Sequence, residues 1–237
     1  MRICFSPAEN EDKAAMKMII AIDGPAGSGK STVAKMISQK YRINYMDTGA
    51  MYRAFALALI NRGIDISDHD AVRAVLEDIN VTVGYCSDGQ HVYVDGRDVT
   101  GSIRTPEVSK GASDVAVIPE VRIKLVKTQR ETAEMYDIVM DGRDIGSYVL
   151  PDAPLKIYLT ASSDVRAQRR QKQLAQAGIS KDFETLRQEI TDRDKTDSTR
   201  EFAPLMKAED AVLIDTSDMD IQEVIAAIEE KIEKVFS

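Results

Sequence analysis

Eight consecutive residues have the types and spacing needed to bind the phosphates of a nucleotide. The run Gly24-Pro25-Ala26-Gly27-Ser28-Gly29-Lys30-Ser31 fits the pattern G-x-x-x-x-G-K-[ST] at every fixed position. Glycines allow a backbone in which successive N–H groups point at one anion. Lys30 is placed to reach the outer phosphates, and the Ser31 hydroxyl to hold Mg²⁺. The segment from Gly24 to Thr32 is therefore predicted to bind ATP.

The segments on either side of this run provide the context that a phosphate-binding loop requires. A continuous apolar run precedes it and predicts a buried parallel strand over residues 18–23. A helical pattern follows and extends to about Lys40. The alternative is a glycine-rich turn that binds nothing, and the strand before and helix after the run argue against it.

Charged residues also follow two other predicted strands. Asp47-Thr48 comes after a short strand over 43–46, and Asp141-Gly142-Arg143-Asp144 comes after a strand over 137–140. In open α/β sheets, ligands bind beyond the carboxyl ends of the strands. A phosphate-binding loop alone does not need these charges, so they indicate a second ligand that faces the nucleoside triphosphate.

A helix predicted from Phe183 also indicates a second ligand. Its apolar stripe, Phe183, Leu186 and Ile190, continues at the same steps of three and four to Arg193, Asp197 and Arg200. Burying such charges without partners would cost several kcal/mol each. A helix that persists this far would therefore place them in a cleft with an anionic, hydroxylated ligand. The alternative is a solvated charge run beyond a helix that frays near Thr196.

Three arginines come from separate segments that such a fold would bring together, namely Arg53, Arg143 and Arg200. The planar guanidinium group binds phosphate through two parallel hydrogen bonds. Taken singly, each arginine would more often be a surface residue. Three arginines near strand ends together favour a phosphate-binding site.

Strands and helices alternate along most of the chain, which predicts an α/β fold with a mostly parallel sheet and helices on both faces. Further strands are expected over 155–160 and 211–215, and further helices over 48–61, over 67–80, from Pro106, from Pro119, from Ser163, from Phe183 and over 221–236. Residues 81–85 and 91–94 alternate in polarity, which predicts an antiparallel hairpin, with a third short strand within 95–100. Residues 67–110 are therefore interpreted as an inserted, chiefly antiparallel subdomain.

The composition is that of a soluble globular protein. The 237 residues carry a net charge of −8, so the chain as a whole is not expected to bind nucleic acid or an anionic membrane. Two cysteines provide no disulfide framework, which predicts a cytoplasmic protein. Both histidines, His69 and His91, are expected at the surface. Residues 1–16 form a polar extension without a signal-peptide pattern, and residues 17–237 are expected to form a single, monomeric domain.

Four blocks of the sequence resemble the bacterial cytidylate kinase family in order and spacing. They are Asp23–Ser31, Asp47-Thr48-Gly49-Ala50-Met51-Tyr52-Arg53, Gly101-Ser102-Ile103-Arg104-Thr105 and Asp141-Gly142-Arg143-Asp144-Ile145-Gly146. Residues 151–154 and 193–200 extend the match, which covers about residue 17 to the C-terminus. The chain has Ser31 where some members have Gly or Thr. Residues 195–196 and 198–199 fall between the matched positions.

The resemblance implies a P-loop nucleoside monophosphate kinase with a core, a helical lid at about 166–185 and an enlarged monophosphate-binding insertion at about 67–110. It implies Mg²⁺-dependent transfer of the ATP γ-phosphate to CMP or dCMP. Arg53, Arg143 and Arg200 would hold the CMP phosphate, and Ser113, Arg122 and Asp144 would read the cytosine edge. Arg193 and Asp197 would contact the sugar, with Thr48 near the same pocket. Arg169 and Arg170 fall in the lid, and the implied catalytic set is Lys30, Arg53, Arg143, Arg170 and Arg200.

Three other functions remain open at this point. Another small-acceptor kinase, acting on UMP, AMP or shikimate, would share the loop and the lid. A regulatory NTPase would need a residue that positions water and no arginines for a second substrate. A non-catalytic nucleotide-binding subunit would be expected to lack Lys30 or Ser31, and both are present.

Overall fold

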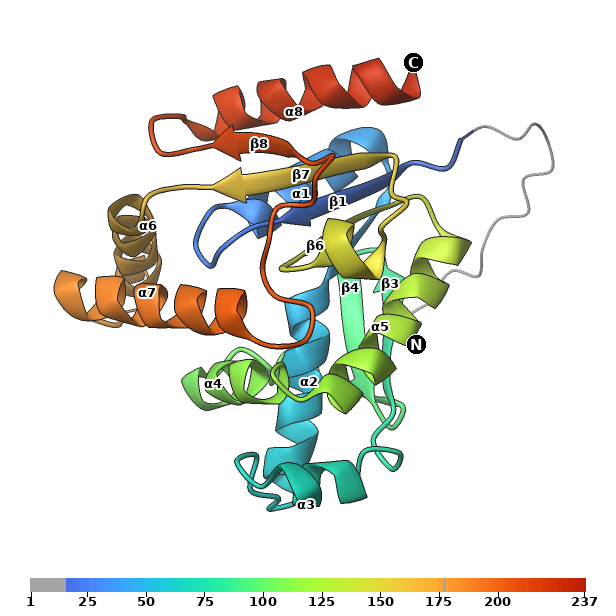
Figure 1. The fold of residues 1–237 in the computed structure, drawn as a ribbon, viewed down its shortest axis with the longest axis vertical. Coiled ribbons are helices and arrows are strands. Elements are labelled where there is room, and N and C mark those ends of the chain that lie inside the picture. Colours follow the sequence, from blue (N-terminus) through green and yellow to red (C-terminus); the bar gives the residue numbers. More distant parts are fainter. Residues whose placement is uncertain (1–15, 177) are drawn as a thin grey trace. The chain divides into compact units, whose positions relative to one another are not determined.

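The structure is a computed structural model that describes residues 16–176 and 178–237 (Figure 1). Apart from Met16, the predicted N-terminal extension lies outside the described residues. The chain divides into two compact units. Unit 1 comprises residues 44–138 with the segment that ends at Lys17, and unit 2 comprises residues 18–43 and 139–237. Within the described part of the chain, no helix has the length and apolar character needed to cross a membrane.

In unit 2, the strands of the main sheet run in the order β6-β1-β7-β8. These are β6 (Ile138–Gly142), β1 (Ile19–Asp23), β7 (Leu155–Thr160) and β8 (Val212–Asp215). The strand β2 (Asn44–Asp47) belongs to unit 1. The pairs β1–β7 and β7–β8 are parallel, with Ile20 opposite Leu155 and Ile157 opposite Val212. Ile20 and Ile22 are fully buried, as expected for a strand covered on both faces. The predicted mostly parallel sheet is confirmed.

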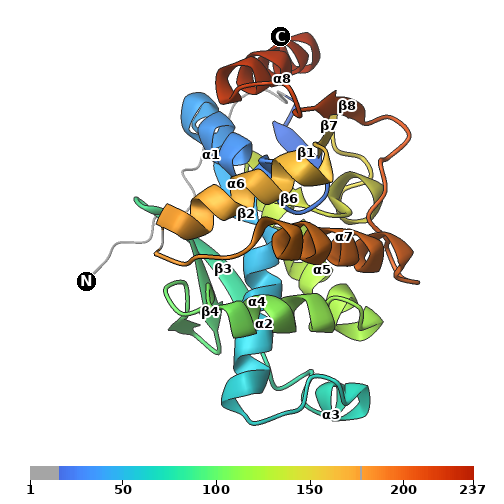
Figure 2. The same cartoon turned by 90° about the vertical axis from the view of Figure 1, so that its left-hand side faces the viewer.

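Unit 2 has two pairs of packed helices. One pair, α1 (Lys30–Tyr41) and α8 (Ile221–Phe236), packs together, and α8 also contacts β7. The other pair, α6 (Ser163–Gln176) and α7 (Phe183–Thr199), lies side by side in both views (Figures 1 and 2). A small apolar core of Ala167, Leu186 and Ile190 joins α6 to α7. Because α7 continues to Thr199, the alternative in which this helix frays near Thr196 is wrong.

Unit 1 is built around α2 (Thr48–Asn61), which packs against α4 (Pro106–Val115) and α5 (Pro119–Met135). The Asp47 side chain caps α2 by accepting a hydrogen bond from the backbone N–H of Ala50. Gly111 lets α4 approach α2 closely, because a Cβ there would lie 3.1 Å from the Cβ of Ala56. The two helix starts predicted at Pro106 and Pro119 are confirmed.

The predicted antiparallel hairpin is also confirmed. It consists of β3 (Val81–Cys86) and β4 (Gly89–Val94), and the short strand β5 (Arg97–Asp98) extends it to three strands. The last pair of the hairpin is Cys86 opposite Gly89, so the turn contains only Ser87 and Asp88. The sheet packs against α2.

The helix predicted over 67–80 is wrong, because only α3 (His69–Ala74) forms. Beyond α3 the chain forms turns in which N–H groups bond three residues back, as from Leu76 to Arg73. Leu76 and Ile79 are still buried. These turns therefore bury the apolar residues whose spacing predicted a longer helix.

The expectation that His91 lies at the surface is also wrong, since its relative exposure is 7%. Its Nδ1 lies 2.7 Å from the Asp98 carboxylate on β5, and its Nε2 lies 2.8 Å from Asp88 in the turn. Hydrogen bonds to Asp98 and then to Asp88 raise the pKa of His91. Local alternation along β4 gives no sign that these two carboxylates enclose the ring.

Candidate active site

The segment between β1 and α1 is a tight loop that requires glycine at two positions. Gly24 has a φ of 145°, and a Cβ there would lie 2.0 Å from the carbonyl oxygen of Leu159 on β7. Gly29, immediately before α1, has a φ of 97° in the left-handed region that favours glycine. The chain therefore turns directly from a strand into a helix N-terminus, where N–H groups lack intrahelical partners and attract anions.

Lys30, the first residue of α1, folds back over this loop. Its Nζ donates a hydrogen bond of 2.7 Å to the carbonyl oxygen of Pro25, and its relative exposure is only 5%. Burial, followed by the charge of Arg143, lowers the pKa of Lys30 to about 7. The charges of Asp141 and Asp23 oppose this shift. An anion bound to the loop would therefore stabilise the ammonium form.

The next residue, Ser31, contacts a carboxylate on β6. Its hydroxyl donates a hydrogen bond of 2.8 Å to Oδ2 of Asp141, which is buried at 5% exposure. A hydroxyl and a carboxylate are hard oxygen ligands of the kind that Mg²⁺ prefers. The donor atoms present here therefore fit the Mg²⁺ site predicted at Ser31.

Asp23, the last residue of β1, joins this loop to the segment after β6. Its two carboxylate oxygens accept hydrogen bonds of 2.6 and 2.7 Å from the backbone N–H groups of Ile145 and Gly146. These residues open η1 (Ile145–Val149), a single turn of π-helix directly after Asp144. Asp23 therefore positions the backbone that carries Arg143 and Asp144.

Replacing Asp23 with asparagine should change how the free energy of unfolding depends on pH. Burial raises the pKa of Asp23 to about 7, so between pH 4 and 7 the folded state holds a proton that the unfolded state releases. The wild-type protein should lose on the order of 2 kcal/mol of stability from this group between pH 4.5 and 6.5. Asp23→Asn removes that loss. Urea unfolding of both proteins at several pH values measures the difference.

The control for this experiment is Asp152→Asn, because Asp152 is exposed. Its unfolding curve should follow that of the wild type at every pH. If the difference in unfolding free energy between Asp23→Asn and the wild type stays constant from pH 4.5 to 6.5, the raised pKa of Asp23 is refuted.

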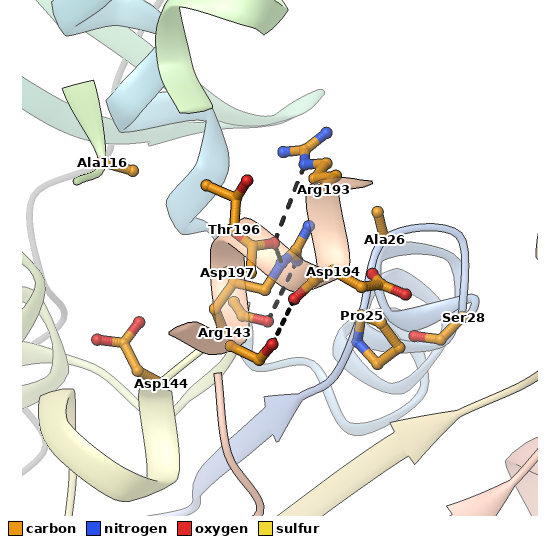
Figure 3. Close-up of polar contacts among 12 residues, drawn as sticks. Pro25, Ala26, Ser28, Ala116, Arg143, Asp144, Arg193, Asp194, Thr196 and Asp197 are labelled. Carbon is orange, nitrogen blue, oxygen red and sulfur yellow. Dashed lines mark hydrogen bonds and ion pairs between the residues drawn. The ribbon is translucent and has the colours of Figure 1, made fainter. Parts of the chain in front are cut away.

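Arg143 and Arg193 both point toward Asp197 on α7 (Figure 3). Arg143 Nε lies 2.7 Å from Oδ2 of Asp197, and Arg193 Nε lies 4.0 Å from the same oxygen. Burial opposes ionisation of Asp197, but the charges of the two arginines hold the pKa of this carboxyl below its ordinary value. The structure therefore brings together the charged stripe on α7 and the residues that follow β6.

Arg200 and Asp144 form a second ion pair, with Nη2 3.3 Å from Oδ1. Both side chains are buried, at 9% and 5% exposure. Arg200 also donates a hydrogen bond of 2.6 Å from Nε to the carbonyl oxygen of Ala203. Five of the predicted site residues therefore form two ion-paired groups in unit 2: Arg143 and Arg193 with Asp197, and Arg200 with Asp144.

Arg166 on α6 was not among the predicted site residues, yet it contacts the phosphate-binding loop. Its Nη1 donates a hydrogen bond of 3.1 Å to the carbonyl oxygen of Ala26 and lies 2.6 Å from Asp194 on α7. Its relative exposure is 6%. Arg166 therefore connects both helices of the predicted lid to the loop. The available signal is weak, because this basic helix contains four candidate cations, Arg166, Arg169, Arg170 and Lys172.

The two lid arginines named from the sequence lie in different surroundings. Arg169 donates hydrogen bonds of 2.9 and 2.7 Å to the hydroxyl and carbonyl oxygens of Thr216, just after β8. Arg170 is exposed and donates a hydrogen bond of 2.8 Å to Gln173 on the same helix. A role for Arg170 at the transferring phosphate remains a prediction.

Unit 1 carries four other predicted site residues, two of them on α2. Thr48 is the first residue of α2 and is buried. Arg53 is half-buried, and its Nη2 lies 2.6 Å from Oδ2 of Asp47, the residue that caps the helix. The charge on the apolar side of α2 is thus paired with the carboxylate that precedes the helix.

The remaining two residues, Ser113 and Arg122, lie on α4 and α5. Arg122 is almost fully buried, with 1% exposure, and its Cζ lies 5.4 Å from the centre of the Tyr52 ring. Its Nη1 donates a hydrogen bond of 3.3 Å to the carbonyl oxygen of Ala116, just after α4. Ser113 is half-buried on α4. A buried arginine of this kind fits either a structural or a ligand-binding role.

The family described as cytidylate kinase matches residues 20–234 of the chain. This chain belongs to the cytidylate kinase family. The match includes every site residue discussed above, from the loop after β1 to Arg200.

Curated members of the cytidylate kinase family are similar to the chain over nearly its whole length. A cytidylate kinase of Streptococcus gordonii is 49% identical over 222 residues, covering 93% of this chain and 99% of its own. One of Caldicellulosiruptor saccharolyticus is 48% identical over 219 residues (92% and 97%), and one of Bacillus subtilis is 47% identical over 218 residues (92% and 97%). A solved structure from Eubacterium ventriosum shares the fold, with a TM-score of 0.52 at 16% identity, covering 92% of this chain and 99% of its own.

Two further residues make contacts in the site, although the sequence predicted no role for them. Asp141 was placed after a predicted strand but received no role, although it contacts Ser31. Asp23 was only part of a matched block, although it holds the start of η1. A charged residue at the end of an apolar strand was the available signal in both cases.

Proposed function

We propose that this chain is a nucleoside monophosphate kinase that transfers the γ-phosphate of ATP to CMP or dCMP, giving ADP and CDP or dCDP. The observation that supports it most is the pairing of two groups in unit 2. One is a phosphate-binding loop with a buried lysine, and the other is a set of arginines paired with Asp144 and Asp197. The first suits a nucleoside triphosphate, and the second suits a second, anionic substrate.

The loop residues would bind ATP. Backbone N–H groups from Gly24 to Thr32 would surround its phosphates, and Lys30 would exchange its hydrogen bond to Pro25 for a phosphate oxygen. Ser31 and Asp141 would hold Mg²⁺, directly or through water. When bound, Mg²⁺ would neutralise charge on the β- and γ-phosphates.

The arginines would bind the acceptor phosphate. Arg143 and Arg200 present planar guanidinium groups that hold phosphate through paired hydrogen bonds. Asp197 and Asp144 orient these arginines through ion pairs. Arg53 on unit 1 is assigned to the same phosphate on the basis of its sequence block.

In the reaction, an oxygen of the acceptor phosphate forms a bond to the γ-phosphorus as the bond to the β-phosphate oxygen breaks. The acceptor oxygen is already anionic near neutral pH, so the protein does not need a strong general base. Its task is to align the two substrates and to stabilise charge on the migrating group. Lys30 and Arg143 would supply that positive charge. Closure of α6 and α7 would exclude water, with Arg166 joining them to the loop.

Base and sugar recognition would use the remaining residues. Asp144 and Ser113 can accept a hydrogen bond from the 4-amino group of cytosine, and Arg122 can donate to its acceptors. Arg193 and Asp197 would contact the sugar, with Thr48 near the same pocket. Uracil presents an acceptor where cytosine presents a donor, and a mispaired polar edge in a buried site costs several kcal/mol.

The test of this function is the rate of ADP release from Mg-ATP with CMP, dCMP, UMP, AMP, GMP or shikimate as the only acceptor. We expect turnover to be largely confined to CMP and dCMP. Turnover with a different acceptor would refute the assigned substrate but keep the loop roles. Slow hydrolysis that ignores every acceptor would favour a regulatory NTPase.

Replacing Asp144 with asparagine should reduce the discrimination between CMP and UMP about tenfold or more. The asparagine amide group can donate to uracil as well as accept from cytosine, so the preference set by the carboxylate is lost. The readout is the ratio of kcat/KM for CMP to kcat/KM for UMP. Because Arg200 serves a phosphate common to both substrates, disturbing its ion pair leaves the ratio unaffected.

The matched control for this variant is Asp152→Asn, which removes an exposed carboxylate from the segment between η1 and β7. Its CMP-to-UMP ratio should equal that of the wild type. An unchanged ratio in Asp144→Asn would exclude Asp144 from base recognition.

We also propose that the protein acts as a monomer in the cytoplasm and binds neither nucleic acid nor membranes. Cysteine usage supports the cytoplasmic location, and the net charge of −8 supports the absence of nucleic-acid and membrane binding. Size-exclusion chromatography with light scattering would test the oligomeric state. A mass of about twice 26.2 kDa would refute the monomer.

A further inference from the structure

The hairpin of unit 1 gathers three side chains that the proposed kinase reaction does not use. Cys86 ends β3, Asp88 lies in the turn, and His91 lies on β4. Each offers one ligand atom, and the sulfur, carboxylate oxygen and ring nitrogen all lie within 4.8 Å of one another. Asp88 is exposed, Cys86 is half-buried and His91 is buried, so the cluster opens to solvent on the side of Asp88.

The strand β5 orients His91 from behind. Oδ2 of Asp98 lies 2.7 Å from Nδ1 of His91, and Oδ1 of Asp98 accepts a hydrogen bond of 2.9 Å from the backbone N–H of Thr100. The other ring nitrogen, Nε2, faces Asp88 at 2.8 Å. A carboxylate behind a histidine is the usual outer partner of a metal ligand, because it fixes the ring and leaves the far nitrogen for the metal.

We propose that Cys86, Asp88 and His91 bind a divalent transition-metal ion of the Zn²⁺ class, with water completing a tetrahedral site. A thiolate, an imidazole and a carboxylate together suit Zn²⁺ or Co²⁺ and disfavour Mg²⁺, which prefers oxygen ligands. Binding requires the thiolate of Cys86 and an unprotonated Nε2 on His91, so the ion competes with protons at these atoms, while Asp98 keeps its hydrogen bond to Nδ1.

The geometry needs little change to accept the ion. Zn²⁺ bonds of about 2.0–2.3 Å place tetrahedral ligand atoms about 3.3–3.7 Å apart. All ligand atoms lie within 4.8 Å of one another, so no pair has to close by more than about 1.5 Å, and the His91–Asp88 pair, now at 2.8 Å, has to open by about 0.5 Å. The exposed Asp88 side chain in the two-residue turn can make most of this movement. The bound ion would tie the turn to β5 through His91 and Asp98.

Cobalt spectroscopy tests the site directly. The starting protein is full-length Cys4→Ser, which leaves Cys86 as the sole cysteine of the chain. Titration with Co²⁺ should produce a thiolate-to-metal band in the near ultraviolet and tetrahedral bands in the visible, with a dissociation constant of about 10 µM or below. Zn²⁺ should abolish these bands, and a hundredfold excess of Mg²⁺ should leave them.

Variants assign the ligands. Adding Cys86→Ser should abolish the near-ultraviolet band, and adding His91→Gln or Asp88→Asn should weaken Co²⁺ binding at least tenfold. Asp98→Asn should weaken it about 10–100-fold while keeping the band, because Asp98 acts through His91. The matched control is His69→Gln, which removes the exposed histidine on α3 and should change nothing.

A second measurement needs no substitution at the cluster and so does not depend on whether a variant folds. In Cys4→Ser, Zn²⁺ should slow the reaction of Cys86 with a disulfide reagent at least tenfold. The proposal is overturned if no thiolate-to-Co²⁺ band forms, if Cys86→Ser binds Co²⁺ unchanged, or if Zn²⁺ leaves the thiol reaction rate unaltered. None of these outcomes bears on whether the chain phosphorylates CMP.

Discussion

Replacing Arg143 with alanine should lower kcat for CMP about 10³-fold or more, because a guanidinium that binds the transferring phosphates contributes on that scale in related reactions. The positive charge of Arg143 lowers the pKa of Lys30, the first residue of α1. Arg143 also pairs with Asp197 at 2.7 Å. Steady-state rates with saturating CMP and Mg-ATP measure the loss.

The same substitution also has a structural effect that must be separated from catalysis. Removing Arg143 leaves the buried carboxylate of Asp197 without its nearest cation, which should cost about 1–3 kcal/mol of unfolding free energy. The double variant Arg143→Ala/Asp197→Asn should recover much of this stability but not the turnover. Arg143→Lys should retain part of the activity, because it keeps the charge but not the planar fork.

The matched control is Arg187→Ala, an exposed arginine on α7 that pairs with Glu184. It should keep wild-type turnover and lose little stability. If folded Arg143→Ala turns over CMP at a near-normal rate, Arg143 does not bind the transferring phosphates.

The sequence predicted those parts of the fold that depend on local patterns. The strand over 155–160 and the helix over 221–236 appear with the predicted bounds, and two further helices start at Pro106 and Pro119 as predicted. Helical periodicity predicted the charged stripe on α7, and the structure places Asp197 of this stripe 2.7 Å from Arg143, which follows β6.

Long-range pairing explains what the sequence did not reveal. His91 is buried by Asp98 and Asp88, whose approach depends on the register of the three-stranded sheet. The π-helical turn η1 exists where Asp23 of β1 accepts two N–H bonds from a segment more than a hundred residues away. Arg166 was one of several cations on a basic helix, and only the packing of α6 onto the loop distinguishes it.

Replacing Lys30 with methionine should have opposite effects on activity and stability. The loss of the ammonium should lower kcat about 10²–10³-fold, because no other residue assigned to the loop supplies a positive charge to the outer phosphates. The stability of the nucleotide-free protein should instead rise. Burial lowers the pKa of Lys30 to about 7, so the folded state holds this charge at a cost that methionine does not incur.

The gain in stability from Lys30→Met should decrease as the pH rises. Below pH 7 Lys30 is charged in both states, and the full cost of burying the charge destabilises the wild type. Between pH 7 and 10.5 the folded state releases its proton first, so wild-type stability rises with pH. The advantage of Lys30→Met over wild type should therefore be largest near pH 6 and should shrink by at least 1–2 kcal/mol, on the order expected for such a shift, by pH 9.

Urea unfolding at pH 6 and 9, together with CMP turnover, measures both effects on the same protein. The matched control is Lys35→Met, an exposed lysine on α1, which should leave turnover and the pH dependence of stability unchanged. A Lys30→Met protein that is less stable than wild type at pH 6 would show that the buried ammonium stabilises the empty loop. Turnover within a few fold of wild type would show that Lys30 does not bind the outer phosphates. Lower turnover together with higher stability is the expected combination, because the Lys30 ammonium is buried at a cost to folding and serves to bind phosphate.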